Sequence, residues 1–246
     1  MFPQTHVYFA QSVLNKVNDA ITLGSIFPDM VIGAGVPRDI SHGKGLEMLA
    51  YPHAGQFFQD FSYGNATHGN EPTGLDYFGD EQYPPFSKGY CFEKARPIIA
   101  STVKACNIPE SMGWWKAHNI VEMGIELRIS QQAPYGALIH QAFGNSALIS
   151  EICQYASAFY QCNPQRIRQC IQGFSHFIDV RPCTPLSLAQ TYSIQMHRRH
   201  QVNIHLVQVA TLIEEASQRV TDDLDVFFQT VTNQVKQTLQ EYQPQS

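Results

Sequence analysis

Several signals are missing from this chain of 246 residues, and each absence narrows its function. No run of about 18 apolar residues is present, although a membrane-spanning helix requires one. The start, MFPQTHVYFAQSVLNK, lacks the basic segment and the continuous apolar segment of a secretory signal. We therefore expect a soluble, cytoplasmic protein without a stable membrane anchor.

Positive charge is also scarce. Lys plus Arg number 16 against 21 Asp plus Glu, which gives a formal net charge of −5. Proteins that coat DNA or RNA need a positive field, so we do not expect nucleic acid as a stable partner. The six cysteines form no CxxC pair, and this favours buried, reduced thiols over disulfides.

Common catalytic motifs are absent as well. The chain contains no GxSxG, no HExxH and no GxxxxGK[ST]. It also lacks the adjacent His-Asp pair of HD-type metallophosphohydrolases. Alternating apolar and polar runs bounded by turns are missing too, so a β-sheet has little support and an all-α fold is predicted.

Composition changes along the chain. Residues up to about 92 carry most of the Gly and Pro, in segments read as loops such as GSIFPDMVIGAGVPRD and NEPTGLDYFGDEQYPPFSKG. The part after His118 is rich in Gln and has long runs of helical period. We divide the chain into a helical region at 1–135 that carries the candidate site and a helical C-terminal region at 136–246, packed in one domain.

The apolar period predicts several helices. The first is expected to begin with Thr5 as its N-cap and to turn His6 inward. On the helix predicted from Trp114 to Ser130, His118 and Glu122 share the apolar face, whereas Lys116 lies elsewhere. The other helices are expected at about 53–68, 93–104, 148–161, 164–177 and 186–203, and in one long final helix with apolar positions from Leu206 to Val231.

Histidines and acids recur at inward positions and at the ends of these elements. A carboxylate on an apolar face, such as Glu122, needs a partner, and His118 one turn earlier presents an imidazole nitrogen to the same point. A hydrogen-bonded pair without metal is the common alternative. The recurrence favours a metal site with an open position, most simply for Zn²⁺, with Mn²⁺ or Fe²⁺ as second choices. The first candidate ligands are His6, Asp29, His42, His68, His118 and Glu122.

These segments carry a resemblance to a known family. In order, TH, GSIFPD, SHG, NATHG and HNIVEMGIE resemble the zinc-dependent phospholipase C family, which is similar in fold and metal site to P1-type nucleases. The resemblance covers roughly residues 5 to 130. It implies an all-α, single multi-helix domain, here with an added helical C-terminal half, and two or three zinc ions.

The resemblance also implies roles for individual residues. Asp29, His42 and His68 would hold the first metal, His6 a second, and His118 with Glu122 a further one. The implied activity is hydrolysis of a phosphoester or phospholipid substrate, as a phospholipase-C-like phosphodiesterase that uses a zinc-activated water. Asp29 would orient or deprotonate that water.

This chain departs from the family at two points. Extracellular members use the amine of a processed N-terminal tryptophan as a ligand, whereas this chain begins MFPQ, so the role of its N-terminal amine is open. Their bridging carboxylate follows the central histidine by four residues, where this chain has Pro72. The bridging ligand is therefore expected from the following loop, as Asp76 or, second, Asp80. Glu126 is a further candidate, as a hydrogen-bond partner of a ligand histidine.

Two readings without catalysis remain open. The chain fits a metal-stabilised helical binding protein whose ligands serve folding alone. It also fits an interaction protein that uses the final helix as a partner surface. Substrate and oligomeric state are not predicted by the sequence.

Overall fold

The computed structural model describes residues 2–52 and 56–242. Secondary structure in these residues is helical, without a strand, which confirms the all-α prediction. None of the helices in the described ranges is both long and apolar enough to cross a membrane. Two features of the sequence lie outside the described residues: the expected helix start at His53 and the terminal amine of Met1.

The chain forms two compact units, each built from three stretches of sequence. Unit 1 comprises Met1–Thr5, Phe78–Pro134 and Arg181–Phe227, and unit 2 comprises His6–Tyr77, Tyr135–Val180 and Phe228–Ser246. Two helices continue from one unit into the other, α1 (Pro3–Leu14) and α14 (Leu224–Glu241). The units are described separately below.

Unit 2 is organised around two helices that pack closely, α2 (Asp19–Val31) and α5 (Gln56–Ala66). Their backbones approach at two glycines: a Cβ on Gly24 would collide with the carbonyl of Phe61, and a Cβ on Gly64 with the carbonyl of Ile21. The remaining helical elements of this unit are η1 (Ile32–Ala34), α3 (Arg38–Gly43), α4 (Gly45–Ala50), α9 (Tyr135–Gly144), α10 (Ser146–Tyr160) and α11 (Pro164–Ser175).

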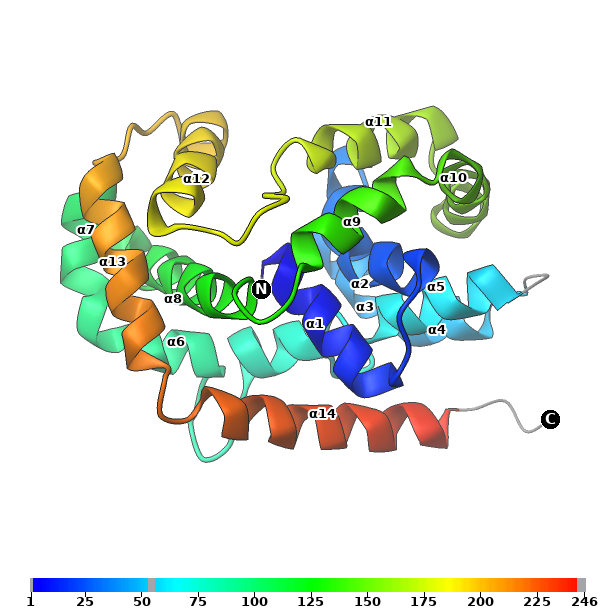
Figure 1. The fold of residues 1–246 in the computed structure, drawn as a ribbon, viewed down its shortest axis with the longest axis horizontal. Coiled ribbons are helices and arrows are strands. Elements are labelled where there is room, and N and C mark those ends of the chain that lie inside the picture. The colour runs from blue at the N-terminus through cyan, green and yellow to red at the C-terminus, as the bar shows by residue number, and fades with distance from the viewer. Residues whose placement is uncertain (1, 53–55, 243–246) are drawn as a thin grey trace. The chain divides into compact units, whose positions relative to one another are not determined.

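Unit 1 is centred on α8 (Gly113–Ile129), whose apolar positions are almost all buried. Figure 1 shows α13 (Leu206–Arg219) running beside α7 (Ile99–Cys106) and α8, with which it is in contact. The other elements are η2 (Tyr77–Glu81), which is a π-helical turn, α6 (Tyr90–Ala95), η3 (Arg96–Ile98), η4 (Glu110–Met112) and α12 (Pro185–His200).

Four local predictions are wrong, and each has a physical reason. The GSIFPDM segment is not a loop: it belongs to α2, which the Asn18 side chain caps and which holds Pro28 inside its buried length. Residues 93–104 are not one helix, because Pro97 interrupts them as η3. The long final helix is two, α13 and α14, separated by a turn at 220–223. Thr5 is not an N-cap, because α1 already begins at Pro3.

Candidate metal centres

Five side chains that the sequence singles out come together in unit 2. Their candidate ligand atoms form two overlapping groups, each with all its atoms within 4.8 Å of one another. One group is His6, His68 and Asp76, and the other is Asp29, His42 and His68. Four of the five are buried, and the side chain of Asp29 is 28% exposed. The predicted ligands of the first and second metals are therefore neighbours in the structure.

The two histidines beside Asp29 are both held through one ring nitrogen. His68 Nδ1 lies 2.6 Å from the carbonyl oxygen of Ser25 on α2, and His42 Nδ1 lies 3.1 Å from the carbonyl of Arg38. A carbonyl only accepts, so His68 Nδ1 carries the hydrogen and His68 Nε2 presents a lone pair, whereas His42 Nδ1 also lies 2.8 Å from the Ser41 hydroxyl. The two Nε2 atoms face each other at 3.3 Å. Metal-binding histidines are typically fixed in this way.

Asp76 reaches the centre because the loop after α5 folds back on itself. The N–H of Asp76 donates to the carbonyl of His68 at 2.8 Å, and the N–H of Leu75 donates to Thr67. α5 has already ended at Ala66, before Pro72, and the following loop supplies the carboxylate, as expected. Asp76 Oδ1 lies 3.3 Å from His6 Nε2, whereas Oδ2 lies 3.4 Å from His42 Nε2. One carboxylate thus faces both groups.

Buried negative charge dominates this centre. Burial raises the pKa of Asp29, but contacts with His42 and His68 outweigh burial and leave it below the ordinary range. Burial also raises the pKa of Asp76, but nearby positive groups outweigh burial and leave it well below the ordinary range. Burial and the neighbouring His6 ring lower the pKa of His68, whose ring stacks on that of His6 at 3.7 Å between centroids. A neutral imidazole between two ionised carboxylates favours a cation at its lone pair.

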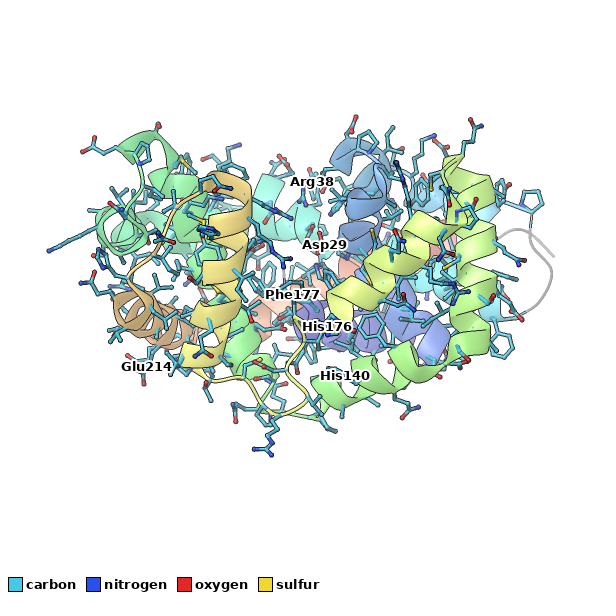
Figure 2. All side chains as sticks on the ribbon, turned by 90° about the horizontal axis from the view of Figure 1, so that it is seen from above. Asp29, Arg38, His140, His176, Phe177 and Glu214 are labelled. Carbon is cyan, nitrogen blue, oxygen red and sulfur yellow. The ribbon has the colours of Figure 1, made fainter. Side chains whose placement is uncertain are left out.

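Asp29 and Arg38, both labelled in Figure 2, are the partly exposed side chains beside this centre, and Arg38 Nη1 lies 3.9 Å from Asp29 Oδ1. Arg38 is 54% exposed, and its guanidinium donates to His42 Nε2 at 3.1 Å and to Asp76 Oδ2 at 3.4 Å. Sequence reasoning missed Arg38. Its spacing of four residues before His42 was the available signal, because on a helix this spacing brings two side chains together.

A third group lies in unit 1 and contains the predicted His118 and Glu122 together with Asp80. His118 Nδ1 lies 2.9 Å from the carbonyl of Trp115, and Nε2 lies 3.1 Å from Asp80 Oδ1 and 3.3 Å from Glu122 Oε1. Burial lowers the pKa of His118, but the charges of Glu122 and Asp80 raise it to about 10. Asp80 therefore joins this group rather than serving as the substitute for Asp76.

Glu126 does not contact a ligand histidine in the structure. Its carboxylate instead caps the start of α1: Oε1 accepts the N–H of Gln4 at 2.9 Å, and Oε2 accepts the N–H of Thr5 at 2.8 Å and its hydroxyl at 2.6 Å. The four first N–H groups of a helix have no partner within the helix. A side chain from α8 thus replaces the local cap that was expected from Thr5, and His6 follows directly in the chain.

The capping carboxylate makes stability depend on pH. Burial raises the pKa of Glu126 to about 7, although the hydrogen bonds from Thr5 and Gln4 lower it. An unfolded glutamate titrates near about 4.3, so between these values the folded protein holds a proton that the unfolded chain has released. Stability is therefore expected to fall as pH rises from about 4.5 to about 7 through this group. Urea unfolding at about pH 5 and about pH 7.5 measures this, and Glu126→Gln should flatten the difference.

The predicted site residues are thus distributed over three groups. Asp29, His42, His68, Asp76 and His6 meet in unit 2, and His118 and Glu122 meet in unit 1 with Asp80. Comparison with protein-family models, with curated proteins and with solved structures finds no match to this chain.

Proposed function

We propose that the protein is a metal-dependent hydrolase of phosphoesters, most concretely a phospholipase-C-like phosphodiesterase that uses zinc. The observation that carries this proposal is the common orientation of three histidines. His42, His68 and His118 each bind a backbone carbonyl through Nδ1 and turn Nε2 towards carboxylates. A hydrogen bond to a carbonyl through one nitrogen, with the other nitrogen directed at carboxylates, is the arrangement of metal-binding imidazoles. A bound cation would replace the proton that His118 holds and the Arg38 hydrogen bond that His42 Nε2 accepts.

The residues fit divalent cations. His6 Nε2 is buried and finds no hydrogen-bond partner among the described residues, although it lies 3.3 Å from Asp76 Oδ1. An unsatisfied buried nitrogen beside an ionised carboxylate is destabilising unless a cation lies between them. Because one imidazole lone pair serves one ion, His68 with His42 and Asp29 accounts for one ion, and His6 with Asp76 for a second. The unit 1 group would hold a further ion.

Imidazole and carboxylate donors without thiolate suit zinc, and zinc held there supplies a nucleophile from water at neutral pH and neutralises phosphoryl oxygens. Asp29 is ionised and partly exposed, so it can accept the proton of an attacking water. The partly exposed guanidinium of Arg38 beside it supplies positive charge to phosphoryl oxygens, in addition to its hydrogen bonds to His42 and Asp76. The neutral His68 stays fixed by Ser25 throughout.

Metal content and hydrolysis measured together test the proposal. Protein purified without added metal is expected to hold two or three zinc equivalents by elemental mass spectrometry, and fewer in the His118→Ala/Glu122→Ala variant. It is expected to hydrolyse bis-p-nitrophenyl phosphate and phosphatidylcholine, to lose this activity with a chelator, and to regain it with zinc. Asp29→Asn should lower kcat at least about 100-fold. Asp39→Asn, an exposed acid on α3, is the matched control.

The metal-stabilised binding protein is the competing function, and the same experiment separates it. A structural metal site is closed, and the partial exposure of Asp29 and Arg38 beside this one favours a catalytic site. Zinc content without hydrolysis of any phosphoester, combined with unfolding on chelation, would establish the binding protein instead. A metal content below about 0.2 equivalents with no uptake of added zinc would rule out both.

A further inference from the structure

Lys116 is a buried cation in an unfavourable place. It lies in the first turn of α8, where the helix dipole is positive and disfavours cations, yet only 4% of the residue is exposed. The sequence pattern had placed it away from the buried face, and that prediction is wrong. Its ammonium donates to His200 Nε2 at 2.9 Å and lies 4.1 Å from the centre of the Trp115 ring. Its partners are therefore an imidazole and an aromatic face, neither of which carries negative charge.

More positive charge surrounds this position. His200 belongs to the last turn of α12 together with Arg199, and burial, Lys116 and Arg199 lower the pKa of His200. Arg199 also acts electrostatically on Lys116. No carboxylate in the described ranges pairs with Lys116, Arg199 or His200. We call the residues Trp115, Lys116, Arg199 and His200 the basic patch.

Helix ends alone do not explain the patch. The negative end of the α12 dipole favours Arg199 and His200, but it does not account for Lys116, which comes from the positive end of α8. The N-terminus of α8 also has no side-chain cap, so its first N–H groups add to the positive potential. Burying a cation without a counterion costs several kcal/mol, and a bound anion offsets that cost.

We propose that the basic patch is a binding site for the phosphate group of an anionic ligand, distinct from the metal centres. Arg199 is exposed and offers the paired donors that match a phosphate, and the buried Lys116 adds a point charge. The Trp115 side chain is 52% exposed at the rim. Exposed tryptophan beside basic residues suits a lipid headgroup as well as a soluble phosphate compound, and the shared chemistry is the phosphate.

Tryptophan fluorescence provides a direct test, because the chain has only Trp114 and Trp115 and the second lies in the patch. Inorganic phosphate is titrated into the full-length protein, and vesicles of phosphatidylcholine with or without phosphatidic acid are used in a sedimentation assay. Phosphate is expected to change the fluorescence saturably, and Arg199→Gln/His200→Gln should weaken the apparent affinity at least about 10-fold. Lys116 is left unchanged because it is buried.

The matched control is Arg166→Gln/His176→Gln, which removes the same residue types from unit 2 and should bind like the wild type. Far-ultraviolet circular dichroism checks that both variants are folded.

Sedimentation with phosphatidic acid vesicles but not with phosphatidylcholine alone identifies a headgroup, whereas binding of free phosphate without sedimentation identifies a soluble ligand. Equal affinity in the wild type and in Arg199→Gln/His200→Gln, or no binding of either probe, would overturn the proposal. Since zinc also attracts phosphate, the comparison of variants is repeated with chelator.

Discussion

Asp76→Asn is expected to remove most of the metal from unit 2 and, with it, the phosphodiesterase activity that we propose. The two oxygens of Asp76 face different histidines, His6 at 3.3 Å and His42 at 3.4 Å, so this substitution touches both candidate ions at once. An amide keeps the shape but loses the charge, and loss of a shared charged ligand should weaken zinc binding well beyond about 100-fold. Elemental analysis and kcat/KM, measured on the same samples, check this.

Thermal unfolding gives a readout of the same substitution that does not depend on activity. Zinc at about 100 times its dissociation constant stabilises a protein by about 2.7 kcal/mol, which for a chain of this size raises Tm by roughly 5–10 °C. That rise should be present in the wild type and in Asp39→Asn and absent in Asp76→Asn. An undiminished rise in Asp76→Asn would show that the bridging position assigned to this carboxylate is wrong.

Glu126→Leu is expected to lower the free energy of unfolding by about 2–4 kcal/mol. Leucine fills a similar volume but leaves the N–H groups of Gln4 and Thr5 and the Thr5 hydroxyl without the carboxylate that accepts all three. Each unsatisfied buried donor is costly, and the start of α1 is expected to fray. Urea denaturation followed by circular dichroism measures the difference.

Two further variants assign that loss to the cap rather than to burial of an apolar group. Glu214→Leu makes the same change at an exposed position of α13, labelled in Figure 2, and should alter stability by less than about 0.5 kcal/mol. Thr5→Val removes only the hydroxyl bond to Glu126, so its effect should be smaller and should largely vanish in the Glu126→Leu background. Additive effects of Thr5→Val and Glu126→Leu would argue against a shared cap.

Local spacing was the part of the candidate site that could be predicted. His118 and Glu122 are one turn apart on a helix, so their contact follows from helical geometry, and α8 confirms the helix. The loop origin of the carboxylate near His68 also followed, because Pro72 excludes helix at that point. The convergence of His6, Asp29 and His42 was inferred only because histidines and acids recur at inward positions. The number of residues between them along the chain does not give their distance in space.

The misses come from tertiary interactions that no window of sequence contains. Asp80 pairs with His118 across 38 residues, and Glu126 caps α1 across 121 residues, so neither partner is visible locally. α2 was read as a loop because Pro28 and its flanking glycines are typical of turns, yet a fully buried helix tolerates them. Lys116 was expected outside because it lies off the helix face that His118 and Glu122 share, yet it is buried beside His200.

The glycines at the crossing of α2 and α5 make the metal centre dependent on two positions that carry no side chain. α2 supplies both Ser25, whose carbonyl fixes His68, and Asp29, while His68 follows shortly after the end of α5. Any side chain at Gly24 or Gly64 would separate the two backbones and draw the carbonyl of Ser25 away from the imidazole. Neither glycine is a candidate ligand, but the addition of a single methyl group, as in Gly24→Ala or Gly64→Ala, would still displace the ligands of the metal centre.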